Sequence, residues 1–135
     1  MSTHGFVVAV AAVIVRGDRA LAMRRSMHKD AGAGLWESVS GRLEPGEQPL
    51  EAMAREVREE SGLDVRLDAR PIDAYVTKRG ERPMCLVLYR ATWIAGEVRR
   101  SEEHDAHAWW TLDEWRAQCS LERLVSAVEL ALASA

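Results

Sequence analysis

Residues 6–15, FVVAVAAVIV, restrict the fold of this chain more than any other stretch of its sequence. The run is apolar throughout and rich in valine, so it has no polar face to turn toward water. That composition is typical of a strand buried on both faces of a sheet. The run is too short to span a bilayer, no Lys or Arg precedes it, and a charged turn follows it. We therefore expect a soluble, cytoplasmic protein without membrane contact, with this strand inside its sheet.

Turn-forming residues divide the rest of the chain into strands, loops and helices. Further strands are expected at residues 20–24, 36–39, 72–78, 84–93 and 109–112, and loops at residues 26–34, 42–48 and 97–107. One helix is expected to begin at Pro49 and stop at Gly62, and a second to cover residues 121–133. Hairpins and crossovers occur together in this pattern, which favours an α/β fold with a mixed sheet covered by helices.

Length, charge and cysteine usage narrow the function. With 135 residues, 47% of them hydrophobic, the chain can bury one sizeable core, so we expect a single domain over residues 1–135. A net charge of −3 and the lack of a Lys/Arg-rich block argue against binding of duplex nucleic acid. Cys85 and Cys119 match no metal-binding or redox spacing, which indicates reduced packing residues.

Residues 41–63, GRLEPGEQPLEAMAREVREESGL, combine an acidic cluster with an amphipathic helix. Helical spacing brings Glu56, Glu59 and Glu60 together within about one turn, on a different side from an apolar or small stripe. The stripe consists of Leu50, Met53, Ala54, Val57 and Ser61. The cluster is either a solvated surface neutralised by basic neighbours or a set of oxygen ligands for Mg²⁺ or Mn²⁺.

The flanks of this helix favour metal binding. Gly41 and Gly62 stand where a tight loop must enter and leave the helix. Glu47 is placed to accept hydrogen bonds from the N-terminal amides of the helix or from Arg55. The segment is thus a loop, a helix and a loop that together present carboxylates, and a divalent ion held there would bridge phosphate oxygens.

Residues 41–63 resemble the Nudix box, G-x5-E-x7-R-E-U-x-E-E-x-G-U, in which U is aliphatic, at every fixed position. The matching residues are Gly41, Glu47, Arg55, Glu56, Val57, Glu59, Glu60, Gly62 and Leu63. From average residue frequencies, a chance match is on the order of one in a billion per window. The flanking strand pattern and the C-terminal helix also look like a Nudix domain. The resemblance therefore covers essentially the whole chain and implies an α/β/α sandwich with a mixed sheet between helices.

The resemblance implies an enzyme that hydrolyses a nucleoside diphosphate linked to another group, by attack of water at phosphorus. A divalent cofactor, Mg²⁺ or Mn²⁺, would neutralise charge on the phosphate oxygens and activate the water. The metal ligands that it implies are Glu56, Glu59, Glu60 and the backbone near Gly41. Arg55 would hold Glu47 and orient the acidic side chains, with Glu47 and Gly62 as structural support.

The general base is expected in a late loop, shortly before a strand that contains tryptophan, as in several members of the family that the box resembles. In this chain Glu102 and Glu103 precede Trp109, and we favour Glu103 as base or additional metal ligand. The competing assignments are a base on the box helix, Glu59 or Glu60, and a solvated loop glutamate without a catalytic role.

Two arginines and two aromatic residues are candidates for substrate contact. Arg24 and Arg25 end the second expected strand, where they would either bind phosphate or form a surface pair. Trp36 would either stack on a base or close the core beneath the box loop, and we favour the core. Tyr75 has the same two interpretations.

The remaining histidines and tryptophans of the second half of the chain are expected to have no catalytic role. His104 and His107 are predicted to be exposed loop histidines. Trp109, Trp110 and Trp115 are predicted to pack under the last helix.

Three functions stay open under the resemblance. The first is hydrolysis of a nucleoside or deoxynucleoside triphosphate to the monophosphate and pyrophosphate, and the second is the same chemistry on a nucleotide sugar, dinucleotide or other diphosphate. The third is a module that binds a nucleotide without cleaving it, against which the intact box glutamates argue. Residues 36–41, WESVSG, loosely resemble the WQSVTG of enzymes that act on dihydroneopterin triphosphate, which favours a compact triphosphate. The expected partner is a small molecule, and the frequent dimers of the family leave a homodimer open.

Overall fold

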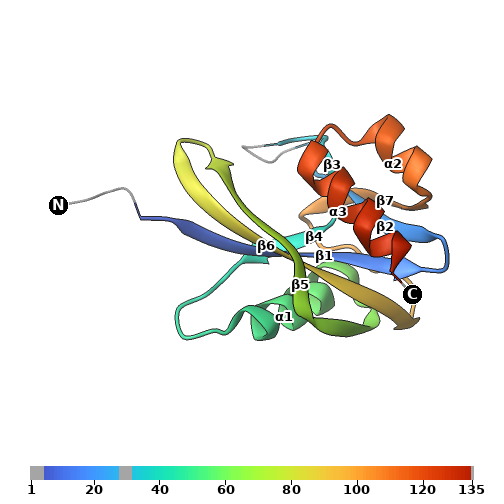
Figure 1. Cartoon of the computed structure of the whole chain (residues 1–135), viewed down its shortest axis with the longest axis horizontal. Helices are drawn as coiled ribbons and strands as arrows, with labels where there is room; N and C mark the ends of the chain where they lie inside the picture. Colours follow the sequence, from blue (N-terminus) through green and yellow to red (C-terminus); the bar gives the residue numbers. More distant parts are fainter. Residues whose placement is uncertain (1–4, 28–31, 135) are drawn as a thin grey trace.

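The computed structural model describes residues 5–27 and 32–134. Its strands form a mixed sheet that lies between α1 (Pro49–Ser61) on one side and α2 (Leu112–Gln118) and α3 (Glu122–Ala133) on the other (Figure 1). This arrangement confirms the predicted α/β fold with a mixed sheet between helices. None of the helices in these residues has the length and apolar character needed to cross a membrane.

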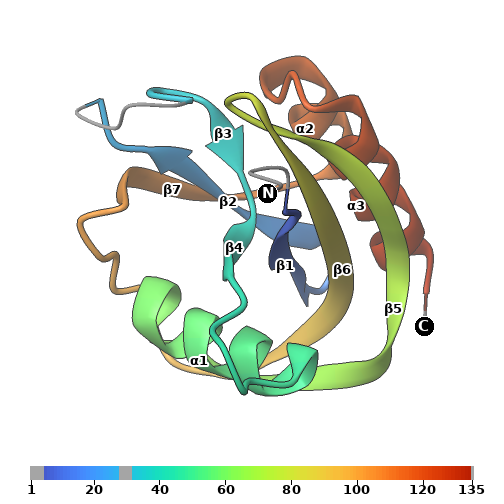
Figure 2. The ribbon, with the colours of Figure 1, turned by 90° about the vertical axis from the view of Figure 1, so that its left-hand side faces the viewer.

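The strand order places β1 inside the sheet. The strands are β1 (Val7–Arg16), β2 (Arg19–Arg25), β3 (Trp36–Glu37), β4 (Val39–Arg42), β5 (Asp64–Arg79), β6 (Arg82–Ala95) and β7 (His104–Trp110). In the order β3-β2-β1-β6-β5, β1 runs antiparallel to β2 and parallel to β6. In addition, β4 pairs antiparallel with β1, and β7 pairs antiparallel with β2 (Figure 2).

Burial of β1 on both faces creates two core layers. Val13 packs in the cluster under α2 and α3, and Ile14 packs in the cluster on the side of α1, and both are fully buried. Each such side chain stabilises the fold by roughly 1.5–3 kcal/mol relative to an exposed one. The prediction that residues 6–15 form a strand buried on both faces is therefore confirmed from Val7 onward, whereas Phe6 precedes β1 and is exposed.

The tryptophans of β7 and α2 divide between the two core layers. Trp110 and Trp115 meet edge to face with 5.4 Å between ring centroids, in the cluster under α3, as predicted. Trp109 packs in the opposite cluster, so its predicted place under the last helix is wrong. Successive side chains of a strand point to opposite faces, which separates Trp109 from Trp110. Cys119 is buried beside Trp115 and, like Cys85, is free, as predicted.

Several predicted boundaries differ from the structure. The strand expected at residues 36–39 is two strands interrupted at Ser38, because β3 pairs with β2 whereas β4 pairs with β1. The loop expected at residues 97–107 ends before His104, where β7 begins. The strand expected at residues 109–112 is wrong at its end, because β7 stops at Trp110 and α2 begins at Leu112. β5 also begins well before the strand expected at residues 72–78.

The sequence did contain a signal for α2 that the strand prediction overlooked. Thr111 precedes the helix, and its Oγ1 accepts a hydrogen bond from the backbone N–H of Glu114 at 3.3 Å. Glu114 Oε1 in turn accepts one from the backbone N–H of Thr111 at 3.0 Å. This reciprocal pair is a capping box, T-x-x-E, which marks the start of a helix.

Candidate functional site

α1 begins and ends at the residues that the sequence predicts. Pro49 occupies its first turn, and Glu51 Oε1 accepts a hydrogen bond of 2.8 Å from the backbone N–H of Gln48. At the other end Gly62 has a φ of 69°, and its N–H donates to the carbonyl of Arg58 at 3.0 Å. The helix packs on β1 and β4 (Figure 2), which fixes the direction of its inner stripe.

The inner stripe of α1 includes two of the three clustered glutamates. Glu56 and Glu60 are each only 7% exposed and lie with the buried Met53 and Val57, whereas the Glu59 side chain is 56% exposed. The prediction that all three lie on a side separate from the apolar stripe is wrong for Glu56 and Glu60. Positions 53, 56, 57 and 60 form one i, i+3, i+4, i+7 stripe, so burial of the apolar pair brings the two carboxylates inward.

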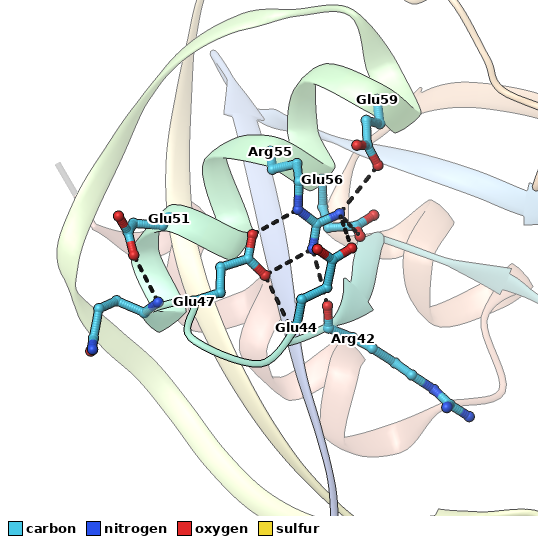
Figure 3. A network of polar contacts seen from close by, with 8 residues as sticks. Arg42, Glu44, Glu47, Glu51, Arg55, Glu56 and Glu59 are labelled. Atoms are coloured by element: carbon cyan, nitrogen blue, oxygen red, sulfur yellow. Dashed lines mark hydrogen bonds and ion pairs between the residues drawn. The ribbon is translucent and has the colours of Figure 1, made fainter.

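Arg55 joins the carboxylates of the box loop and of α1 (Figure 3). Its Nε and Nη2 donate to the two oxygens of Glu47 at 2.7 and 3.0 Å, which is one of the two contacts predicted for Glu47. Its Nη1 donates to Glu56 Oε1 at 2.8 Å and to Glu59 Oε2 at 3.2 Å. The hydrogen bond from Arg55 lowers the pKa of Glu47 from 4.5 to about 2, and the pKa of Arg55 is raised. The loop is therefore tied to the helix by a charged, bidentate contact.

Gly41, in β4, lies against the carboxylate of Glu56. A Cβ atom added at position 41 would overlap the side-chain carboxyl group of Glu56, so a residue larger than glycine requires that carboxylate to move. Burial raises the pKa of Glu56, and the charges of Glu60 and Glu59 raise it further, against the opposing effect of Arg55. An additional positive charge beside Glu56 would therefore stabilise its ionised form.

Glu60 contacts the turn before β7 and the first residue of that strand. Ser101 Oγ donates to Glu60 Oε2 at 2.8 Å, and His104 Nδ1 lies 3.2 Å from the same oxygen without an aligned hydrogen bond. On its other side, His104 Nε2 lies 2.8 Å from Glu37 Oε2. Burial alone would lower the pKa of His104, but the carboxylates of Glu37 and Glu60 raise it from 6.5 to about 9. His104 is 4% exposed, so its prediction as an exposed loop histidine is wrong.

A pocket of about 480 Å³ opens beside β4, on the face of the sheet opposite α1. Its walls come from β1, the β3–β4 segment, the β5–β6 hairpin and the start of α3. Its lining residues are Ala9, Ala11, Glu37, Ser38, Ser40, Gly41, Tyr75, Thr77, Lys78, Met84, Leu86, Ser120, Leu121, Glu122, Arg123 and Leu124. Gly41 thus lies between the pocket and Glu56.

The family model described as the NUDIX domain matches residues 5–127. The chain belongs to the Nudix hydrolase family. The box segment at residues 41–63 and the α/β/α architecture are thus those of a Nudix domain, as the resemblance implied. The residues that flank the box are part of the same match.

Three comparisons illustrate how similar other Nudix proteins are to this chain. A MutT-like protein of Streptomyces ambofaciens is 40% identical over 79% of this chain, and the match spans 65% of that protein. The CTP pyrophosphohydrolase of Escherichia coli K12 is 30% identical over 78% of this chain and 76% of its own length. The crystal structure of the MutT protein from Methanosarcina mazei Go1 superposes with a TM-score of 0.84 at 22% identity and covers 97% of this chain and 96% of its own. The last comparison is evidence for the fold.

The Nudix box carboxylates provide an open set of donors for a divalent ion. Nudix hydrolases generally use such an ion. In the described part of the chain, Glu56 Oε2 and Glu60 Oε1 accept no hydrogen bond, while the second oxygen of each carboxylate is held by a neighbour. Among residues 5–27 and 32–134, no group of three or more His, Cys, Asp or Glu side chains is arranged to hold a metal ion by itself. This donor set fits Mg²⁺ or Mn²⁺, which bind few carboxylates and keep water or phosphate oxygens in their remaining positions.

Three other candidate residues lie at the end of β2 and in the turn before β7. Glu103 is half-buried in the turn before β7, and its backbone N–H donates to Ser101 Oγ at 3.1 Å. Arg24 forms a surface pair with Asp105 at 2.8 Å, whereas the Arg25 side chain is only 12% exposed.

Two aromatic candidates lie on the side of the sheet that carries α3. Trp36 packs in the core cluster there, with its ring centroid 4.5 Å from that of Trp110, which confirms the favoured interpretation as a core residue. Its predicted place beneath the box loop is wrong, because Leu43 of that loop packs in the opposite cluster. Tyr75 lines the pocket, and the guanidinium of Arg123 lies 4.3 Å from its ring centroid. Arg123 is held by both oxygens of Asp73, at 3.0 and 3.1 Å. Tyr75 is therefore available to a ligand in the pocket, whereas Trp36 packs against Trp110 in the core.

Three residues at the site carried no functional prediction. Ser101 and His104 meet Glu60 from the segment leading into β7 and from the start of that strand, and His104 also meets Glu37 of β3. No local spacing marks them, because each contact joins residues more than 40 positions apart in the chain.

Proposed function

We propose that the protein hydrolyses a nucleoside or deoxynucleoside triphosphate to the nucleoside monophosphate and pyrophosphate, with Mg²⁺ or Mn²⁺ as cofactor. The observation that carries the proposal is the position of Gly41, which lines the pocket and also lies against the carboxylate of Glu56. A nucleoside in a pocket of about 480 Å³ would have its phosphates beside the box carboxylates. The name of the Escherichia coli relative, CTP pyrophosphohydrolase, supports a triphosphate as substrate.

In this proposal the box residues hold the ion and keep its ligands in place. The ligands are Glu56, Glu59, Glu60 and the backbone of Gly41. A divalent ion at this position supplies positive charge for the phosphate oxygens and lowers the pKa of a bound water. Arg55 holds Glu47 and Glu56 at 2.7 and 2.8 Å, so the carboxylates need little rearrangement when substrate binds.

A carboxylate must also accept the proton of the attacking water. We assign this role to Glu103, because it lies in the turn whose Ser101 contacts Glu60. Glu59 is the alternative base on α1, since its side chain is 56% exposed and is held by one contact with Arg55. Glu60 is the less suitable base of the two on α1, because Ser101 already donates to one of its oxygens.

The two ends of the pocket suit the two ends of a nucleotide. Tyr75 and Arg123 present an aromatic ring and a cation that would contact the base. Arg24 and Arg25 would contact the phosphates from the end of β2, with Trp36 behind the wall of the pocket. Arg25 Nη1 lies 3.4 Å from the carboxylate of Glu37, and Glu37 lines the pocket.

The proposal is tested by a product screen. The protein is incubated with nucleoside triphosphates, nucleotide sugars and dinucleoside polyphosphates, with Mg²⁺, with Mn²⁺ and with EDTA, and the products are separated and identified. We expect pyrophosphate and a nucleoside monophosphate from at least one triphosphate, only with metal. Cleavage restricted to nucleotide sugars or dinucleotides would show that the substrate belongs to one of those classes and is not a triphosphate. Absence of cleavage together with metal-dependent nucleotide binding would show a sensing module instead.

A further inference from the structure

The segment that leads into β7 closes over the C-terminal end of α1 (Figure 2). There Ser101 Oγ and His104 Nδ1 both lie within 3.2 Å of one oxygen of Glu60, Oε2. The opposite nitrogen of His104 lies 2.8 Å from Glu37, a residue of the pocket wall. A buried chain of side chains thus runs from the pocket wall on β3, through β7, to the box helix.

We propose that Ser101 and His104 are positioning residues that fix the carboxylate of Glu60 for metal binding and link it to Glu37 in the wall of the substrate pocket. The inference rests on the proposed function for the identity of Glu60 as a metal ligand. It concerns two residues outside the Nudix box. They act through Glu60 and do not touch the reacting atoms.

The geometry of Glu60 supports this role. Its carboxylate would be free to rotate about its last bond if it had no partner. Ser101 holds Oε2 at 2.8 Å, and in the described residues Oε1 accepts no hydrogen bond. One oxygen is therefore anchored and the other is left for an ion. Residues that orient a metal ligand in this way commonly contribute about 10- to 100-fold to metal affinity.

The surroundings of His104 make it suitable as a rigid link. Its side chain is only 2% exposed, and Glu37 on its far side also lies 3.4 Å from Arg25 Nη1. Displacement of Glu37 by a ligand in the pocket would therefore move His104 and, through it, Glu60. A neighbouring residue of the same strand, His107, contacts Arg100 at 2.8 Å and has no contact with Glu60. His107 is thus a matched control for His104.

The test measures binding of Mn²⁺ alone to the full-length protein, by calorimetry or by electron paramagnetic resonance, without a nucleotide. We expect Ser101→Ala and His104→Asn to weaken Mn²⁺ binding about tenfold. Ser101→Thr, which keeps the hydroxyl, and His107→Ala are expected to bind Mn²⁺ within about threefold of the wild type. Equal affinity of Ser101→Ala and the wild type, or equal weakening by Ser101→Ala and Ser101→Thr, would overturn the proposal. If His104→Asn does not fold, the comparison of Ser101→Ala with Ser101→Thr still tests the proposal.

A double variant distinguishes action through Glu60 from a general loss of structure. Adding Ser101→Ala to Glu60→Gln should weaken Mn²⁺ binding no further than Glu60→Gln alone, whereas independent effects would multiply. Failure of the inference and failure of the proposed function are separate results. Weaker Mn²⁺ binding by the variants, together with no cleavage of a triphosphate by the wild type, would contradict the proposed reaction but not the positioning role. Triphosphate cleavage by the wild type, together with unchanged Mn²⁺ affinity in the variants, would contradict the positioning role but not the proposed reaction.

Discussion

At the scale of single residues, Gly41 has less room for a side chain than any other described glycine. Any side chain at this position meets the carboxyl group of Glu56, which Arg55 holds from the other side at 2.8 Å. We expect Gly41→Ala to lower kcat by at least about a hundredfold, because a displacement of roughly 1 Å at a reacting centre has an effect of this size. Steady-state kinetics with saturating Mg²⁺ measure this change in kcat.

The matched control for Gly41→Ala is Gly80→Ala. Gly80 lies in the β5–β6 turn with a φ of 62°, and, apart from its two chain neighbours, no atom of the described residues lies within 4 Å of a Cβ added there. The control variant is expected to lose some stability, because of its positive φ, and to keep kcat within about threefold of the wild type. Equal kcat in Gly41→Ala and the wild type would contradict the contact between Gly41 and Glu56.

The pair of Glu47 and Arg55 predicts a pH-dependent stability. The pKa of Glu47 is about 2 in the folded protein, against an ordinary value of 4.5, so ionised Glu47 stabilises the folded state above pH 4.5. That stabilisation is lost as the pH falls from 4.5 toward 2. We therefore expect Glu47→Gln to be less stable than the wild type at pH 7, with a difference that shrinks at pH 3.

Urea unfolding at both pH values measures this difference. Comparison of two proteins at each pH cancels the titration of the other carboxylates to first order. A difference in unfolding free energy that is the same at pH 7 and pH 3 would show that the pair does not stabilise the fold.

Residue-level predictions from the sequence succeeded where the contact is local. The contact of Glu47 with Arg55 follows from eight residues of spacing around the start of a helix. The contact of His104 with Glu60 depends on the register of β7 on β2, which no short pattern specifies. A histidine between acidic residues in a polar stretch is more often exposed, which is why the prediction of an exposed His104 was wrong.

At the scale of secondary-structure elements, the stop of α1 at Gly62 positions the end of the site. Gly62 has a φ of 69°, and only Leu63 separates it from the start of β5. We expect Gly62→Ala to destabilise the protein by about 1–2 kcal/mol, since a left-handed conformation has about that cost for a residue with a Cβ. The kcat of the folded variant should stay within about tenfold of the wild type.

Thermal and urea unfolding measure the loss of stability, with Gly80→Ala in the β5–β6 turn as a second left-handed position outside α1. Both variants should lose similar stability. A Gly62→Ala variant as stable as the wild type would contradict the strain at this helix end.

The elements predicted best were those with the strongest local signals. β1 has an unbroken apolar run, and α1 has proline and glycine at its ends. The segment at residues 36–42 and the start of α2 were predicted less well. β3 and β4 separate only because each pairs with a different strand, which is a property of the sheet and not of the segment.

At the scale of the whole molecule, the proposed function depends on a meeting of parts that are distant in sequence. The box helix carries the carboxylates, while the pocket is formed by strands from both halves of the chain and by the start of α3. Met84 enters the pocket wall because β6 pairs with β1, where it lies opposite Val7. The family was therefore predictable from 23 consecutive positions, whereas the shape of the pocket was not.

The central claim is that carboxylates on α1 hold the ion that cleaves a triphosphate in the adjacent pocket. The most direct test is the rate of pyrophosphate release by the wild type and by Glu60→Gln at saturating Mg²⁺, with circular dichroism to confirm the fold of the variant. Gln keeps the shape of the side chain and removes its charge. We predict a rate at least about a hundredfold lower in Glu60→Gln, as expected for a lost metal ligand. A folded Glu60→Gln variant with a rate near that of the wild type would contradict the claim.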